Sequence, residues 1–178
     1  MVTGLKDSEL KDSGERREFK TGAVRDRAVG KGLPSLLSAP FMKDIIDEIS
    51  IGDDYVKDAL SGMYGILFDK DWKQALEVAS SLITIKGFAI AIRRLSVQIE
   101  KGAIKYSKRN WEKGMPLEEY CNSAIRHILA MIAGEDDEDH YAAALFNVMA
   151  LYHTGYMISK NKLPKELNNL PGGAGYAI

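Results

Sequence analysis

The sequence predicts an all-α protein. Between residues 41 and 159 the apolar side chains recur three or four positions apart, which is the spacing of one face of an α-helix. The chain shows no strand hairpin, no internal repeat and no alternation of strands with helices. With 178 residues, 46% of them hydrophobic, it can bury a core, and its length fits one domain with extensions.

We expect three parts within this one domain. Residues 1–40 carry glycines among many charges and lack helical periodicity, so they are predicted to form an extended N-terminal arm. Residues 41–160 hold the periodic segments and are predicted to form the helical body. Residues 161–178 are rich in glycine and asparagine, and they are predicted to be a flexible C-terminal tail that closes no core.

The helical body opens with a pair of short helices. The pair is interrupted at residues 52–54, and apolar residues keep the helical spacing on both sides: Ile45, Ile46, Ile49, Val56, Leu60, Met63 and Tyr64. A third helix follows Asp71, which is a suitable N-cap. β-Branched residues at 83–85 disfavour a helix, but we expect this region to be mainly helical.

Three longer helices follow. The first spans about residues 91–106, and four residues form its core face: Leu95, Ile99, Ala103 and Tyr106. Pro116 and Leu117 introduce the second, which lasts to about Ala133 and is closed by Gly134. The third runs from about Asp137 to Ser159, and one stripe beside its apolar face holds Asp136, His140, Ala143 and Asn147.

Charge and cysteine content exclude several classes of protein. The 24 lysines and arginines balance 25 aspartates and glutamates, so a nucleic acid polymer is not an expected partner. Cys121 is the only cysteine, which excludes a disulfide framework and a cysteine zinc site. No apolar leader or membrane-spanning run is present, so we expect a soluble cytoplasmic protein without a membrane partner.

Five acidic residues follow one another from Glu135 to Asp139, directly before His140. Acidic side chains favour the first turn of a helix, which explains two or three of them. Carboxylates crowded in this way also repel one another, and a bound cation would relieve the repulsion. The run therefore indicates a helix start, a metal site, or both.

A basic stretch with two aromatic residues lies upstream of the acidic run: Lys105, Tyr106, Lys108, Arg109, Trp111 and Lys113. Its cations can bind phosphate oxygens. Acidic residues that gather cations, together with basic residues that gather phosphates, suggest a nucleotide as the ligand. The segment Gly30-Lys31-Gly32 lacks the spacing of a phosphate-binding P-loop, so a Walker-type ATPase is not expected.

Several segments carry a family resemblance: Gly22-Ala23-Val24-Arg25-Asp26, Gly30-Lys31-Gly32, Lys105-Tyr106, Arg109-Asn110-Trp111-Glu112-Lys113-Gly114, Ser123-Ala124-Ile125-Arg126-His127, Gly134-Glu135-Asp136, and His140 with Asn147. In this order, they resemble the phage-type dATP/dGTP diphosphohydrolases, which are similar to the all-α MazG-like nucleotide pyrophosphohydrolases. The resemblance implies a MazG-like helical bundle with an extended N-terminal arm, in which residues 41–160 form the catalytic part.

The resemblance also implies an activity. Water would attack the α-phosphorus of a purine deoxynucleoside triphosphate, dATP or dGTP, and release the monophosphate and pyrophosphate, which would control a nucleotide pool. Mg²⁺ would be the cofactor, and Mn²⁺ can substitute. The protein would be a homodimer or homotetramer, located in the host cytoplasm if phage-encoded. A metal-dependent nucleotide sensor without turnover is the alternative. A dimetal oxidase would use Glu-x-x-His pairs on two helices, and here only Asp137-x-x-His140 approximates one.

The resemblance assigns the acidic cluster to the metal. The ligands would be Glu135, Asp136 and Asp139, while Asp137 and Glu138 are solvated. Glu100, from the neighbouring helix, would take part in catalysis or be a surface carboxylate. His140 would bind the metal, orient a carboxylate or move a proton, or else be a packed histidine. The resemblance also assigns His127 to the catalytic group.

The remaining candidates would bind the substrate: Lys105, Arg109, Lys113 and Arg126 at the phosphates, Trp111 on the purine ring, and Asn110 and Asn147 at base or sugar edges. Trp111 can instead cap the core, and the asparagines can instead cap helices. Arg25 and Lys31 would reach the nucleotide if the arm folds over it. Leu33, Ser107 and the long connection over residues 41–90 depart from the family pattern, which affects the expected base preference rather than the fold.

Overall fold

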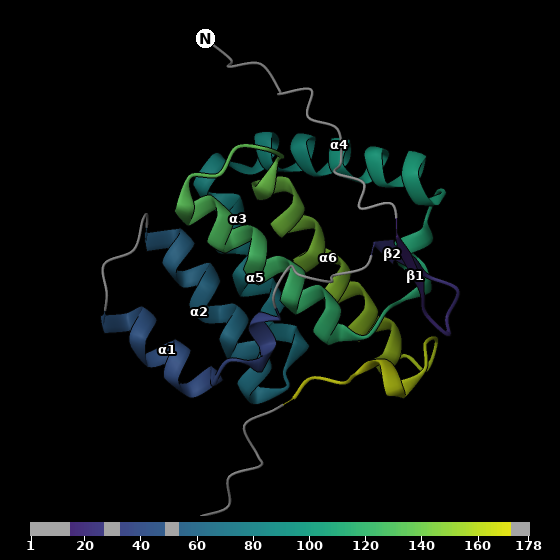
Figure 1. Cartoon of the computed structure of the whole chain (residues 1–178), viewed down its shortest axis with the longest axis horizontal. Helices are drawn as coiled ribbons and strands as arrows, with labels where there is room; N and C mark the ends of the chain where they lie inside the picture. Colours follow the sequence, from purple (N-terminus) through teal and green to yellow (C-terminus); the bar gives the residue numbers. More distant parts are fainter. Residues whose placement is uncertain (1–14, 27–32, 49–53, 172–178) are drawn as a thin grey trace, which may run out of the picture.

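Six α-helices account for most of the chain that the structure describes (Figure 1). The structure is a computed structural model, and it describes residues 15–26, 33–48 and 54–171. The helices are α1 (Ala39–Glu48), α2 (Asp54–Asp69), α3 (Ala75–Lys86), α4 (Phe88–Tyr106), α5 (Leu117–Ala133) and α6 (His140–Ser159). The all-α prediction is confirmed, and each predicted helix corresponds to one of these six.

Helix α6 lies at the centre of the packing. It contacts α3, α4 and α5, and its buried residues do not follow a single stripe. A helix surrounded by others has no continuous polar face, which explains this pattern. It begins at His140 rather than near Asp137, because the Asp139 side chain caps it by accepting a hydrogen bond from the Ala142 N–H at 2.9 Å.

The core lies between α6 and the helices α2, α3 and α5. Large side chains from all four are fully buried there, including Tyr64, Leu82, Ile125 and Leu151. Helix α4 runs across one end of this group (Figure 1) and packs less closely. On α4 Leu95 is buried as predicted, but Ile99 is half buried and Ala103 lines a cavity.

Glycines end two of the helices in left-handed or extended positive-φ conformations. Gly134 adopts φ 75° after α5, and its N–H donates to the carbonyls of Ala130 and Met131, as the sequence predicts for a helix end. Gly87 adopts φ 78° between α3 and α4. The β-branched residues at 83–85 do not stop α3, because it continues to Lys86. Asp71 caps the short 3₁₀ turn η2 (Trp72–Gln74) by accepting from the Lys73 N–H.

A short hairpin contradicts the expectation that the chain contains none. Strands β1 (Arg16–Glu18) and β2 (Val24–Asp26) pair antiparallel, and Gly22 supplies φ 77° in the turn between them. The three-residue strands carry no alternation of apolar and polar side chains, so they gave no pattern to detect. The strand β2 is instead held by the Asn110 side chain, which donates to the Val24 carbonyl and accepts from the Val24 N–H.

Residues 161–171 differ from the flexible tail expected from the sequence. They contain the 3₁₀ turn η4 (Lys165–Leu167), and Leu167 and Leu170 are buried. The Asn169 side chain accepts from the Glu118 N–H at the start of α5 and donates to the Glu118 carboxylate. Two leucines and one asparagine are therefore enough to fasten a segment whose composition suggests a loop.

Within the described helices, none is by itself long and apolar enough to cross a membrane. Two consecutive segments, Trp72–Lys86 and Phe88–Tyr106, are long and apolar enough only when they are taken together. The chain bends by 108° between them.

Candidate functional site

A cavity of about 410 Å³ opens between the hairpin and the helices α4, α5 and α6. Its wall also includes the 3₁₀ turn η3 (Asn110–Lys113) and the acidic segment that precedes α6. Most of the predicted site residues line it: Arg25, Lys105, Arg109, Asn110, Trp111, Arg126, His127, Glu135, His140 and Asn147. The fold thus brings residues up to 122 positions apart, Arg25 and Asn147, into direct contact.

The remaining predicted residues are not part of the cavity lining. Glu100 and Asp136 are exposed. Lys113 is also exposed, and its Nζ donates to the Gly22 carbonyl in the hairpin turn at 3.1 Å. Asp139 caps α6. Lys31 lies outside the described residues.

Asp139 has a different environment from the one expected of a metal ligand. Both oxygens of its carboxylate accept hydrogen bonds from the Arg94 guanidinium on α4, the bond from Nε measuring 2.9 Å. Burial by itself would raise the pKa of Asp139. The hydrogen bonds from Arg94 and the Ala142 N–H, together with the positive charges of Arg94 and Lys101, outweigh burial and lower that pKa. The carboxylate therefore fastens α4 to the start of α6.

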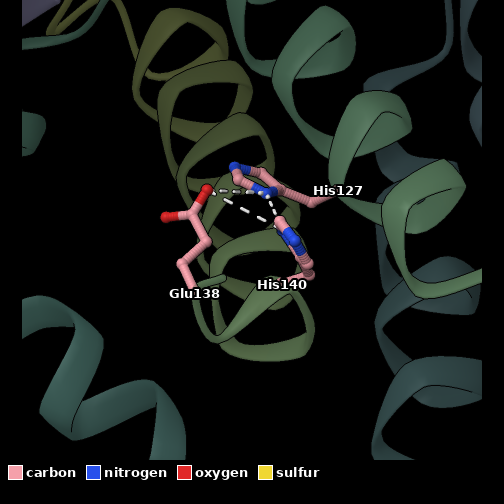
Figure 2. Close-up of side chains that lie close together, drawn as sticks. All are labelled: His127, Glu138 and His140. Atoms are coloured by element: carbon pink, nitrogen blue, oxygen red, sulfur yellow. Dashed lines mark hydrogen bonds and ion pairs between the residues drawn. The ribbon is translucent and has the colours of Figure 1, made fainter. Parts of the chain in front are cut away.

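Two histidines and a glutamate meet at one end of the cavity (Figure 2). His127 comes from α5, His140 is the first residue of α6, and Glu138 lies in the segment between the two helices. The two Nδ1 atoms are 3.1 Å apart. The Glu138 Oε1 atom lies 3.6 Å from Nδ1 of His127 and 3.7 Å from Nδ1 of His140. This cluster can hold a cation, because all three groups offer a lone pair at short range.

A second acidic pair faces the other nitrogen of His140. Its Nε2 atom is 2.8 Å from Asp137 Oδ1 and 3.9 Å from Glu135 Oε2. Asp137 and Glu138, which were expected to be solvated, both line the cavity, with the Asp137 side chain 38% exposed and the Glu138 side chain 18% exposed. The sequence contains this Asp137-x-x-His140 spacing, and Asp137 lies in the segment before α6 with its carboxylate beside the His140 ring.

Arg25 reaches the cavity from strand β2. Its Nη2 donates to the Asn147 side-chain oxygen at 2.8 Å, and its Nη1 donates to the Glu119 carbonyl at 3.5 Å. The Asn147 amide nitrogen in turn donates to the Ala143 carbonyl at 2.7 Å, which fixes the orientation of the amide. Burial lowers the pKa of Arg25. Asn147 therefore holds the half-buried Arg25 guanidinium in the cavity wall.

Arg126 on α5 adds a second guanidinium to the same wall. Burial, and secondly the positive charge of Arg25, lower the pKa of Arg126 to about 10. Glu119 opposes this shift. Two guanidinium groups in one cavity, of which Arg25 lowers the pKa of Arg126, form a site that an anion would stabilise.

Lys105 is less available than its sequence position suggests. Its Nζ donates to Asp26 Oδ2 at 2.7 Å, and the Tyr106 hydroxyl donates to Oδ1 of the same carboxylate at 2.9 Å. Burial opposes the charge of Lys105, but the hydrogen bond and the charge of Asp26 outweigh burial and raise the pKa of Lys105. This group joins α4 to the hairpin and keeps β2 against the cavity.

Trp111 of η3 contributes an aromatic ring to the cavity lining. Trp111 packs edge-on against Phe146 and His153, with ring centroids 6.4 and 5.0 Å apart. Asn110 lines the cavity, but its amide is used on the Val24 backbone. Arg109 is 80% exposed and pairs with Glu112. The cavity is therefore lined by the Trp111 indole as well as by charged groups.

The fold and the cavity together define an all-α protein whose site combines candidate cation ligands with buried guanidinium groups, an arrangement expected of a metal-dependent phosphohydrolase. The family model described as "dATP/dGTP diphosphohydrolase, N-terminal" matches residues 69–162, which is more than half of the chain, so the chain belongs to this family. No curated protein and no solved structure matches the chain. The matched region covers α3 to α6, while Arg25 and its hairpin lie outside it.

Proposed function

We propose that the protein hydrolyses a purine deoxynucleoside triphosphate, dATP or dGTP, to the monophosphate and pyrophosphate. One observation carries the proposal: a single cavity places the His127, Glu138 and His140 cluster together with the guanidinium groups of Arg25 and Arg126. Membership of the family supports nucleotide hydrolysis of the dATP/dGTP diphosphohydrolase type. Attack at the α-phosphorus is the finer part of the proposal.

The guanidinium groups would bind the phosphate chain. Burial lowers the pKa of both groups, and the charge of Arg25 lowers that of Arg126 further; a triphosphate would oppose these shifts by adding negative charge nearby. Guanidinium forks also match phosphate oxygens in geometry. Because Asn147 and the Glu119 carbonyl hold Arg25 in place, part of the ordering cost is met before the substrate binds.

The residues present fit a divalent cation. The carboxylates of Glu135 and Asp137 both line the cavity, and their oxygens lie within 4.8 Å of each other. Mg²⁺ is the proposed cofactor, with Mn²⁺ as a substitute. When bound, such an ion supplies a water of lowered pKa and neutralises phosphate charge.

Proton removal from the attacking water needs a group inside the cavity. Glu135 meets this requirement, because it lines the cavity and its side chain is 59% exposed. Its Oε2 lies 3.9 Å from Nε2 of His140. Glu100 does not line the cavity, so we assign the role of proton acceptor to Glu135 instead.

The purine would rest against the apolar side. Trp111, Phe146 and Ile99 line this side. The edge-on contacts of Trp111 with Phe146 and His153 fix the indole and leave it a rigid wall. A purine buries more flat surface on such a wall than a pyrimidine does, which favours dATP and dGTP.

Product analysis tests the proposal. The protein is incubated with each canonical dNTP and NTP, with Mg²⁺ or with EDTA, and the products are separated by ion-exchange chromatography. Monophosphate with pyrophosphate, formed from dATP or dGTP in Mg²⁺ and not in EDTA, is the expected result. Diphosphate with free phosphate would place the attack at the γ-phosphorus. Nucleotide binding without product would identify a nucleotide sensor.

A further inference from the structure

We propose that His127, His140 and Glu138 bind a first-row transition-metal ion of the Mn²⁺, Co²⁺ or Zn²⁺ type in the absence of nucleotide. This ion would be separate from the Mg²⁺ that enters with a triphosphate. For its catalytic role the inference rests on the proposed function, but the binding itself requires no substrate. Figure 2 shows the three side chains, which converge from α5, from α6 and from the segment between them.

The spacing of the three donor atoms fits a metal ion. The two Nδ1 atoms and Glu138 Oε1 form a triangle with sides of 3.1, 3.6 and 3.7 Å. The point equidistant from all three corners lies about 2.0 Å from each, which is the length of a bond from a transition metal to nitrogen or oxygen.

Asp137 gives His140 the correct tautomer. Its Oδ1 lies 2.8 Å from Nε2 of His140, so the hydrogen of a neutral ring is favoured on Nε2. The lone pair of Nδ1 then faces the triangle. A carboxylate that orients a metal-binding histidine in this way is a common outer-shell partner and increases the basicity of the ligand.

The donor types select the metal. Two imidazole nitrogens and one carboxylate oxygen favour transition ions, whereas Mg²⁺ prefers oxygen ligands and retains several waters. The side chain of His140 is 7% exposed, and those of His127 and Glu138 are each 18% exposed. All three line the cavity, so the coordination positions that remain would face a bound substrate.

Helix capping does not account for Glu138. Asp139 already caps α6 and pairs with Arg94, so the helix start is stabilised without its neighbour. Glu138 instead places its carboxylate within 3.7 Å of two histidine nitrogens that lie on separate helices. The three groups interact in the absence of an ion through the hydrogen bond between the rings, and a bound cation would take the place of that bond.

The full chain, stripped of metal with EDTA and free of nucleotide, is titrated with Co²⁺. Visible absorption spectra monitor the binding. We expect ligand-field bands that saturate at one Co²⁺ per chain, that Zn²⁺ abolishes, and that millimolar Mg²⁺ leaves in place. His127→Gln and Glu138→Gln should each weaken Co²⁺ binding at least about 100-fold. His153→Gln, at the one remaining histidine, is the matched control and should bind as the wild type does. Far-UV CD checks that each variant is folded.

The possible outcomes separate this inference from the proposed function. Absent bands, displacement by Mg²⁺, or equal binding by folded Glu138→Gln would overturn the transition-metal site, even if the protein hydrolyses dATP or dGTP with Mg²⁺. Saturable Co²⁺ binding that both substitutions remove would support it, even if no nucleotide is hydrolysed.

Discussion

At the scale of the residue, the position of Arg25 depends on groups from two helices. The Asn147 side chain of α6 and the Glu119 carbonyl of α5 both accept from its guanidinium. Asn147 was predicted to read a base or sugar edge, but its two amide atoms are used on Arg25 and on the Ala143 carbonyl. We therefore propose that it is a positioning residue, which acts on the substrate through Arg25.

This geometry predicts graded kinetic effects. Arg25→Gln should lower kcat/KM for the purine deoxynucleotide at least about 100-fold, because it removes a charged phosphate ligand. Asn147→Ala should lower it only about tenfold, mainly through KM, because the guanidinium remains but is less well oriented. Arg93→Gln, at an exposed arginine on α4, is the control. Equal kinetics for all three variants in steady-state assays would remove Arg25 from the site.

The buried thiol of Cys121 gives a second prediction at this scale. Burial, and secondly the negative charge of Glu118, raise the pKa of Cys121, and the residue is fully buried. Since the thiolate is the reactive form, the native protein should react with the thiol reagent DTNB at least about 100-fold more slowly than the protein unfolded in guanidinium chloride. Rapid native labelling would show that α5 opens often.

Sequence alone identified the chemical types in the site better than their roles. Most predicted residues do line the cavity, because family motifs and helical spacing locate positions along a chain. The acidic run could not be resolved in this way: adjacent carboxylates look equivalent until α6 starts at a defined residue. The start at His140 turns Asp139 towards the Ala142 N–H and Arg94, and leaves Asp137 and Glu138 beside the histidines.

At the scale of the element, helices were predictable and the hairpin was not. Helices are predicted from residues that are close together in the chain, such as the apolar periodicity, Gly134 at a helix end and the cap at Asp71. These signals can therefore be read from the sequence. Strand β2 depends on Asn110 and Asn147, which lie far along the chain. The position of Asn169 likewise depends on a distant residue, because its side chain bonds to Glu118 at the start of α5.

The contact between η2 and α6 gives a prediction about stability. A Cβ atom at Gly155 would lie 2.3 Å from the Trp72 ring, which packs edge-on against Tyr152. Gly155→Ala should therefore lower the free energy of unfolding by about 1–3 kcal/mol, because it forces the indole out of place. Urea denaturation measures the change.

Gly102→Ala is the matched control, because it changes the same residue type within a helix. A Cβ atom there would meet no other atom within 4 Å, and alanine favours the helix by up to about 1 kcal/mol. An equal loss of stability in both variants would mean that the Trp72 contact is not the cause.

At the scale of the whole molecule, ligand binding should be visible as thermal stability. A non-hydrolysable α,β-imido analogue of dATP or dGTP with Mg²⁺, at 100 times its dissociation constant, would stabilise the folded state by about 2.7 kcal/mol. For a chain of this size we expect the melting temperature to rise by about 5–10 °C. The shift in melting temperature should disappear in EDTA and be smaller in Arg126→Gln. An equal shift in EDTA would mean that the nucleotide binds without the cation.

The number of chains in the assembled protein stays a prediction. The expected homodimer or homotetramer comes from the family resemblance, and light scattering on the purified protein would distinguish these states from a monomer. The apolar pattern of a helix shows which face is buried. It does not show whether that face packs within the chain or against a second copy.

The docking of β2 also determines when the cavity can be completed. Val24 bonds to a side chain 86 positions later in the chain, and Arg25 to one 122 positions later. A ribosome releases the hairpin segment first, but its partners on η3 and α6 do not exist until most of the chain has been made. The earliest described residues to be synthesised are thus among the last to reach their final place. A nascent chain that stops before α6 lacks Asn147, one of the two groups that hold Arg25, so the cavity can be completed only after α6 emerges.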